Sequence, residues 1–155
     1  MQLATSISTG ITLCSLAILA SAAAARFEDT PVTTDHGTTL AVRGVLTDLP
    51  GRDIQVRLSA SGVAAVSCYN PNGKRVPGQR STSRVTLNGT QNLPASDVVN
   101  GRVSFDVATD PLVTTGKHLC PNETWTAQVE DVQFQTVTIR VVQDGKVVVT
   151  QTWNP

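Results

Sequence analysis

Runs in which hydrophobic and polar residues alternate fill most of the chain from residue 40 to its end. In the clearest run, residues 54–60, every even position carries an apolar side chain: Ile54, Val56, Leu58 and Ala60. The odd positions of the same run carry Gln55, Arg57 and Ser59. Alternation with a period of two places the two sets on opposite faces of a β-strand. The pattern therefore predicts a strand with one buried face and one solvated face.

Similar alternation marks the segments 40–45, 66–68, 85–87, 103–107, 125–129, 137–141 and 147–153. Gly, Pro and Asn separate the runs, and the abundance of Val and Thr favours strands over helices. About seven strands predict an all-β fold, an antiparallel immunoglobulin-like β-sandwich, with a small β-barrel as the alternative. Ser61 and Gly62 interrupt the longest run and predict a bulge. Phe134 is out of phase with Val137, which predicts a bend or bulge between them.

The last two runs predict a hairpin. A three-residue loop that ends at Gly145 pairs Val141 with Val147 and Ile139 with Val149, so that one face is apolar throughout. A two-residue loop would set polar side chains opposite apolar ones. We therefore expect the three-residue loop, with its glycine in the left-handed conformation.

The first 25 residues have a different character. The apolar stretch 11–25 ends in four alanines directly before Arg26, and it is short for a membrane span. We expect residues 1–25 to be a secretory signal peptide and residues 26–37 to be a flexible polar lead-in. Residues 38–155 then form a single β-sandwich domain, of a size that suits one core. The mature protein is expected to be secreted and extracellular, without a membrane span.

Cysteine usage agrees with an extracellular location. Loss of the leader removes Cys14 and leaves Cys68 and Cys120, which we expect to form a disulfide in an oxidising compartment. Because the chain has no Cys-x-x-Cys motif, a structural staple is favoured over a redox or metal-binding pair.

Positive and negative charges balance over the whole chain, but basic residues cluster in one segment. Twelve basic and twelve acidic residues give a formal net charge of zero, so nothing directs the protein to nucleic acid or anionic lipid. The segment 69–84 is a predicted polar loop and carries the strongest basic cluster. Its candidate binding residues are Tyr69, Lys74, Arg75, Arg80 and Arg84. An extracellular protein or an acidic polysaccharide is the kind of partner that this loop would suit.

No pattern in the chain marks a catalytic or metal site. His36 and His118 are the only histidines, too few for a metal site, and no nucleophile motif surrounds a serine. Glu130 and Asp131 are adjacent, so on a strand their carboxylates point to opposite faces. We therefore expect no cofactor, no metal and no enzymatic activity. A hydrolase would require at least two side chains to converge from this set: His36, His118, Asp106, Asp110, Glu123 and Glu130.

Two further kinds of surface residue are candidates. Asn88 and Asn122 lie in Asn-x-Thr sequences that match the N-glycosylation acceptor pattern. Trp125 and Trp153 align with the inward faces of their strands and are expected to pack in the core. Tyr69 is the aromatic residue expected to be exposed.

Several segments resemble a group of small secreted proteins, mostly bacterial and of uncharacterised function, over residues 53–152. The resembling segments are 66–73 (VSCYNPNG), 76–79 (VPGQ), 93–96 (LPAS), 100–105 (NGRVSF) and 120–127 (CPNETWTA). The resemblance implies secretion, one disulfide and a β-sandwich. It implies no substrate and no catalytic residue.

The function expected from the sequence is non-enzymatic binding through surface loops. The loops 69–84 and 110–124 are the candidate contact regions, because the expected disulfide joins them. A carbohydrate-binding or cell-wall-associated module is one alternative and predicts exposed aromatic residues. A small secreted hydrolase with an unrecognised site is the other.

Overall fold

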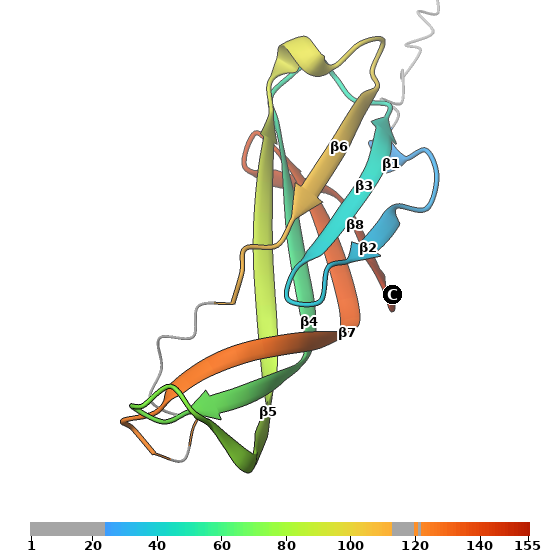
Figure 1. Cartoon of the computed structure of the whole chain (residues 1–155). Coiled ribbons are helices and arrows are strands. Elements are labelled where there is room, and N and C mark those ends of the chain that lie inside the picture. The colour runs from blue at the N-terminus through green and yellow to red at the C-terminus, as the bar shows by residue number, and fades with distance from the viewer. Residues whose placement is uncertain (1–23, 113–119, 121) are drawn as a thin grey trace, which may run out of the picture.

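The computed structural model describes residues 24–112, 120 and 122–155, without the side chains of residues 76–82. These residues form eight strands and one short 3-10 turn, η1 (Ala95–Asp97), arranged as two antiparallel sheets (Figure 1). The predicted all-β sandwich is confirmed, and over the described ranges the sheets do not close into a barrel. The expected signal peptide lies, but for its last two residues, outside the described residues. In the described part of the chain, no helix has the length and apolarity that a membrane span requires.

The smaller sheet, sheet A, is built around β3 (Leu40–Thr47). One side of β3 pairs with β6 (Val103–Ala108), and the other pairs with β1 (Arg26–Phe27) and β2 (Val32–Asp35). The expectation of a loose lead-in over residues 26–37 is therefore wrong. Its two strands are short and largely exposed on both faces, so they lack the alternation that identifies a half-buried strand.

The larger sheet, sheet B, has the strand order β5-β4-β7-β8. Its strands are β4 (Ile54–Tyr69), β5 (Arg75–Leu93), β7 (Thr126–Gln143) and β8 (Lys146–Trp153). The first three are 16, 19 and 18 residues long, far longer than the runs that the sequence pattern marked. Parts of them continue past the strands of sheet A (Figure 1). We call this extension the arm: residues 61–69 of β4, 75–86 of β5 and 126–136 of β7.

Two apolar clusters hold the fold together. The main core lies between the sheets and is formed by residues that include Leu40, Val42, Leu46, Val56, Leu58 and Ile139. A second cluster contains Ala64, Val66 and Val132 of the arm and Leu87, the residue next to the arm in β5. Because burial of apolar surface is the main stabilising term, the arm has its own but much smaller source of stability.

Bulges in β7 accommodate the bend of the arm. Its pairing with β4 shifts register between Ser61 and Gly62 and again between Ala65 and Val66, which leaves one extra residue in β7 each time. The first shift is a bulge between Phe134 and Val137, which confirms the prediction of a bend or bulge there. The bulge expected in β4 lies in its partner instead, because β4 keeps its alternation through this point.

The C-terminal hairpin differs from the expectation. Asp144 and Gly145 form a two-residue loop with φ values of 50° and 75°, and Gln143 pairs with Lys146. A register shift after the loop then places Val149 opposite Val141. The predicted three-residue loop is wrong because the extra residue is taken up in β8 as a bulge and not in the loop.

Side-chain hydrogen bonds close both open sides of the sandwich. On one side, the Asp106 backbone N–H donates to Gln91 Oε1 at 2.9 Å, which links β6 to β5. On the other, Trp153 Nε1–H donates to Thr33 Oγ1 at 3.0 Å, which links β8 to β2. The first bond satisfies a backbone N–H group of β6, an edge strand, and the second joins a side chain of each sheet.

Candidate binding face

The face of sheet B that turns away from sheet A, here called the outer face, is defined by the odd positions of β4. Even positions such as Val56 and Leu58 are buried in the main core, whereas Gln55, Arg57 and Ser59 are exposed or half-buried. Strand pairing extends this division across the sheet. Residues directly opposite an odd β4 position therefore share the outer face with it.

Two arginines face one another at the centre of the outer face. Arg57 in β4 pairs directly with Arg140 in β7, and both residues are exposed. No acidic side chain among the described residues forms an ion pair with either of them. Like charges directly opposite each other on antiparallel strands repel and destabilise the sheet. Fold stability therefore does not explain this pair.

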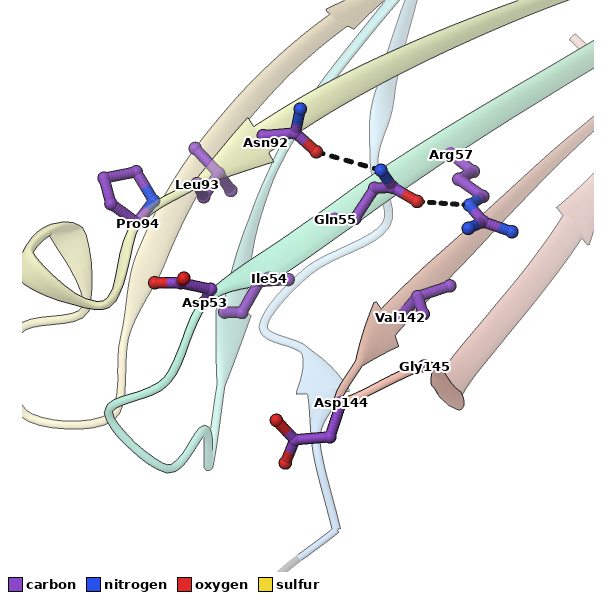
Figure 2. A pocket seen from close by; sticks show the side chains of 10 residues that line it. All are labelled: Asp53, Ile54, Gln55, Arg57, Asn92, Leu93, Pro94, Val142, Asp144 and Gly145. Carbon is purple, nitrogen blue, oxygen red and sulfur yellow. Dashed lines mark hydrogen bonds between the residues drawn. The ribbon is translucent and has the colours of Figure 1, made fainter.

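Amide side chains hold Arg57 in place. Arg57 Nε–H donates to Gln55 Oε1 at 2.5 Å, and Gln55 Nε2–H donates to Asn92 Oδ1 at 2.9 Å (Figure 2). The chain of bonds runs across the outer face from β4 to β5. Since it uses only the Nε–H group, the two terminal nitrogens of the Arg57 guanidinium remain available for a ligand.

Two shallow hollows flank Arg57. The first, of about 430 Å³, reaches the end of the sheet, where Asp53 and Asp144 line it (Figure 2). Asp144 is held by Arg52 at 2.5 Å, and Asp53 accepts a hydrogen bond from the backbone N–H of Ala95 at 2.9 Å.

The second hollow, of about 380 Å³, is lined by both Arg57 and Arg140 and by no acidic residue. Its remaining lining is amide, hydroxyl and apolar, including Asn88, Thr90, Thr138, Val142 and Val147. Val147 is 56% exposed there. The hollow thus combines positive charge with neutral hydrogen-bonding groups.

The predicted loop 69–84 is mostly strand, which corrects the expectation. Only the tight turn between Tyr69 and Arg75 is irregular, and β5 continues from Arg75 to Leu93. Within the turn, Asn70 Oδ1 accepts the backbone N–H of Lys74 at 2.9 Å. The sequence of segment 69–84 is largely polar and does not alternate between apolar and polar residues, so it did not predict a strand.

Strand register places two of these basic residues, Arg75 and Arg84, on the outer face. Arg84 pairs with Val63 and is exposed, Arg80 pairs with Ser67, and Arg75 pairs with Tyr69. Lys74 is exposed in the turn. The Arg80 side chain is outside the described part of the structure. Arg84 has no acidic partner among the described side chains, so it continues the positive charge from the sandwich onto the arm.

Arg75 has a different environment. Its guanidinium lies 2.8 Å from Glu130 Oε1, and the same carboxylate oxygen accepts a 2.6 Å hydrogen bond from the Ser67 hydroxyl. Ser67 is buried, with 1% of its surface exposed. Glu130 is one of the extra residues in β7, so the bulge turns its carboxylate toward β4 and β5. This network fixes the arm, and Arg75 is engaged within the protein.

The predicted disulfide is confirmed. Cys68 and Cys120 are bonded, with a Cα–Cα distance of 5.8 Å. Cys68 is the penultimate residue of β4 and points into the arm's apolar side, with 1% of its surface exposed. The bond ties the segment before β7 to the far end of the arm, although residues 113–119 of that segment lie outside the described ranges.

Among the side chains considered for a hydrolase, Asp106, Glu130 and His36 lie on separate elements. Asp106 in sheet A pairs with Arg43 at 2.8 Å, Glu130 lies in the arm, and His36 lies in the turn between β2 and β3. His118 is outside the described residues. Over the ranges that the structure describes, no three or more His, Cys, Asp or Glu side chains are grouped as a metal site would require.

The remaining candidates occupy varied positions. Asn88 is exposed on the outer face opposite Ser59, and Asn122 is exposed before β7. Trp153 packs against the main core but stays partly accessible, and Trp125 and Tyr69 are half-buried. Sequence reasoning missed Arg140 and the role of Arg57. Arg57 was recognised as a polar-face residue, but its juxtaposition with Arg140 requires the register between β4 and β7.

Comparison with known proteins adds little. No family model matches the chain, and no curated protein matches it. Among solved structures, a glycosyl hydrolase family 2 member from Bacteroides cellulosilyticus DSM 14838 is similar at 15% identity with a TM-score of 0.31. The match covers 82% of this chain but only 14% of that protein. Similarity at this level carries no argument about the function of this chain.

Proposed function

We propose that this protein is a secreted, non-enzymatic binding module that contacts an extracellular partner through the outer face of sheet B. The supporting observation is the position of Arg57, Arg84 and Arg140. They are separated in the sequence, share one solvent-exposed face, and have no acidic partner among the described residues. The proposal keeps the expected kind of function and moves the contact region from loops to a sheet face.

A sheet face is suited to binding because it is already ordered. Its backbone hydrogen bonds, the Glu130 network and the disulfide hold the strands in place before any partner arrives. Association therefore loses less conformational entropy than it would with a mobile loop. The uneven distribution of charge also draws an acidic partner to one side of a protein with zero net charge.

A binding panel tests the proposal. The purified, oxidised protein is offered to an immobilised acidic polysaccharide, a neutral polysaccharide and an acidic protein, at low and high salt. The double variant Arg57→Ser/Arg140→Thr should bind at least tenfold more weakly to whichever probe retains the native protein. Salt should weaken the retained interaction, because exposed charges are screened.

The matched control is Arg43→Ser/Arg102→Ser. These arginines lie on sheet A and beside it, are paired with Asp106 and Glu28, and their loss changes the net charge equally. The control variant should bind like the native protein. Equal losses in both variants, or no binding to any probe, would overturn the proposal.

A further inference from the structure

The chemistry of the outer face allows the partner to be defined more narrowly. We infer that it binds a linear acidic polysaccharide, whose anionic groups are held by Arg57 and Arg140 at the second hollow and by Arg84 on the arm. This inference rests on the proposed function and adds the class of ligand and its direction along the face.

The paired arginines require an anionic ligand. In antiparallel strands, directly opposed Cβ atoms are about 5 Å apart, so both guanidiniums can reach one anionic group. A carboxylate or sulfate placed between them removes their mutual repulsion and accepts paired N–H donors from a planar fork. A neutral ligand would leave the repulsion in place.

The lining of the second hollow favours a sugar over a peptide. Asn88, Thr90 and Thr138 offer donors and acceptors together, as the hydroxyl groups of a sugar require. Val142 and Val147 add an apolar surface for the C–H face of a ring. An extended peptide commonly binds a sheet through backbone groups at an edge strand, whereas this site lies on a face.

The position of Arg84 indicates a polymer. Arg84 pairs with Val63, six residues along β4 from Arg57. At roughly 3.3 Å per residue, the two contact points are about 20 Å apart along the strand. A single anion or monosaccharide cannot touch both points, but a chain of several sugar residues can.

Acidic residues limit the path of that chain. Asp53 and Asp144 line the first hollow and would repel an anionic sugar there. Asp131 pairs with Ala65 and so shares the outer face of the arm, but it lies in β7, where its carboxylate is beside Gly37. The polysaccharide therefore extends from the second hollow toward Arg84 along β4 and β5, which keeps it away from β7 and Asp131.

The test compares four probes of matched chemistry by titration. They are polygalacturonate, its fully methyl-esterified form, short galacturonate oligomers and polyglutamate. Polygalacturonate should bind at least tenfold more tightly than the uncharged ester and than polyglutamate. A fifth probe, sulfated dextran, distinguishes sulfate from carboxylate as the preferred anion. Equal affinity for the ester, or for polyglutamate, would overturn the inference.

Variants then test the direction of binding. Arg84→Ser should weaken binding of the long polymer severalfold and leave binding of the short oligomers unchanged, because these reach only the second hollow. Arg57→Ser/Arg140→Thr should weaken both. If Arg84→Ser binds the long polymer as tightly as the native protein does, the two-point arrangement is overturned.

The outcome separates the two proposals. The protein could bind a neutral glycan or an acidic protein through Arg57 and Arg140 and fail to bind polygalacturonate and sulfated dextran. That result would support the proposed binding function and overturn the inference. If the outer-face variants bind every probe as tightly as the native protein does, both the proposed function and the inference are overturned.

Discussion

At the scale of single residues, Arg57 and Arg140 are placed where stability alone disfavours them. Two exposed arginines are paired directly opposite each other in β4 and β7, without an acidic partner among the described side chains. Natural proteins accept such local costs at functional positions, where removing the cost usually also removes function. The pair can therefore be tested through stability and binding together.

Replacing Arg140 by Thr should have opposite effects on the two properties. Removal of the repulsion and the high strand preference of Thr should raise the unfolding free energy by about 0.5 kcal/mol. Affinity for polygalacturonate should fall at the same time. Urea unfolding measures the first effect and titration the second. A less stable variant with unchanged affinity would show that Arg140 has a structural role instead.

Gly89 illustrates a different residue-scale constraint, set by a neighbouring backbone. A Cβ atom at this position would lie 1.9 Å from the carbonyl oxygen of Ala108, where the chain leaves β6 and crosses β5. Glycine is required here for close approach, because the Asp110 N–H also donates to the Asn88 carbonyl at 2.7 Å.

Gly89→Ala should therefore lower the unfolding free energy by roughly 1–3 kcal/mol, the usual range for overpacking. Gly51→Ala is the control, because nothing lies within 4 Å of its Cβ position and its φ is not in the left-handed region. The control should change stability by less than about 0.5 kcal/mol. Similar urea midpoints for the two variants would contradict this account.

At the scale of elements, the arm depends more than the sandwich does on a few local polar contacts and a disulfide. Among the described residues, its apolar cluster has four buried members, whereas the main core has fifteen. The Ser67–Glu130–Arg75 network and the disulfide at Cys68 compensate for this small cluster. The arm should therefore open at lower free energy than the sandwich when the disulfide is removed.

The double variant Cys68→Ala/Cys120→Ala should lose about 4 kcal/mol of stability if the chain-entropy model applies to the closed loop. Hydrogen exchange should show that arm amides such as that of Val132 lose protection first, while amides of Val56 and Ile139 stay protected longer. A uniform loss of protection would show that arm and sandwich open as one unit.

At the scale of the whole molecule, the two sheets are joined at their sides as well as through the core. Gln91 links β5 to β6, and the indole of Trp153 links β8 to β2 through Thr33. The second link explains why Trp153 stays partly accessible. A tryptophan needs a partner for its N–H group, and here the partner lies on the other sheet.

A double-mutant cycle of Trp153→Phe and Thr33→Val should isolate this link. Each single variant should lose stability, and the coupling energy should be about 1 kcal/mol, the usual net value of a hydrogen bond. Urea unfolding of the four proteins measures it. A coupling energy near zero would show that the contact between the sheets is carried by packing alone.

The sequence by itself determined the fold class, the disulfide pair and most core faces. Alternation with a period of two is a local signal, so Val56, Leu58 and Ile139 could be assigned to the core without a structure. Cys68 and Cys120 were the only pair left once the leader was set aside. Each of these conclusions needed only neighbouring residues or a count of cysteines.

Only the tertiary structure decided which polar residues share the outer face. The juxtaposition of Arg57 and Arg140 depends on register between strands more than 80 residues apart, and register is altered by bulges such as that at Glu130. A bulge also explains the incorrect C-terminal loop, whereas the strands before residue 37 were missed because they are largely exposed and do not alternate. Strand pairing is a non-local interaction, and a bulge leaves no reliable local pattern in the sequence.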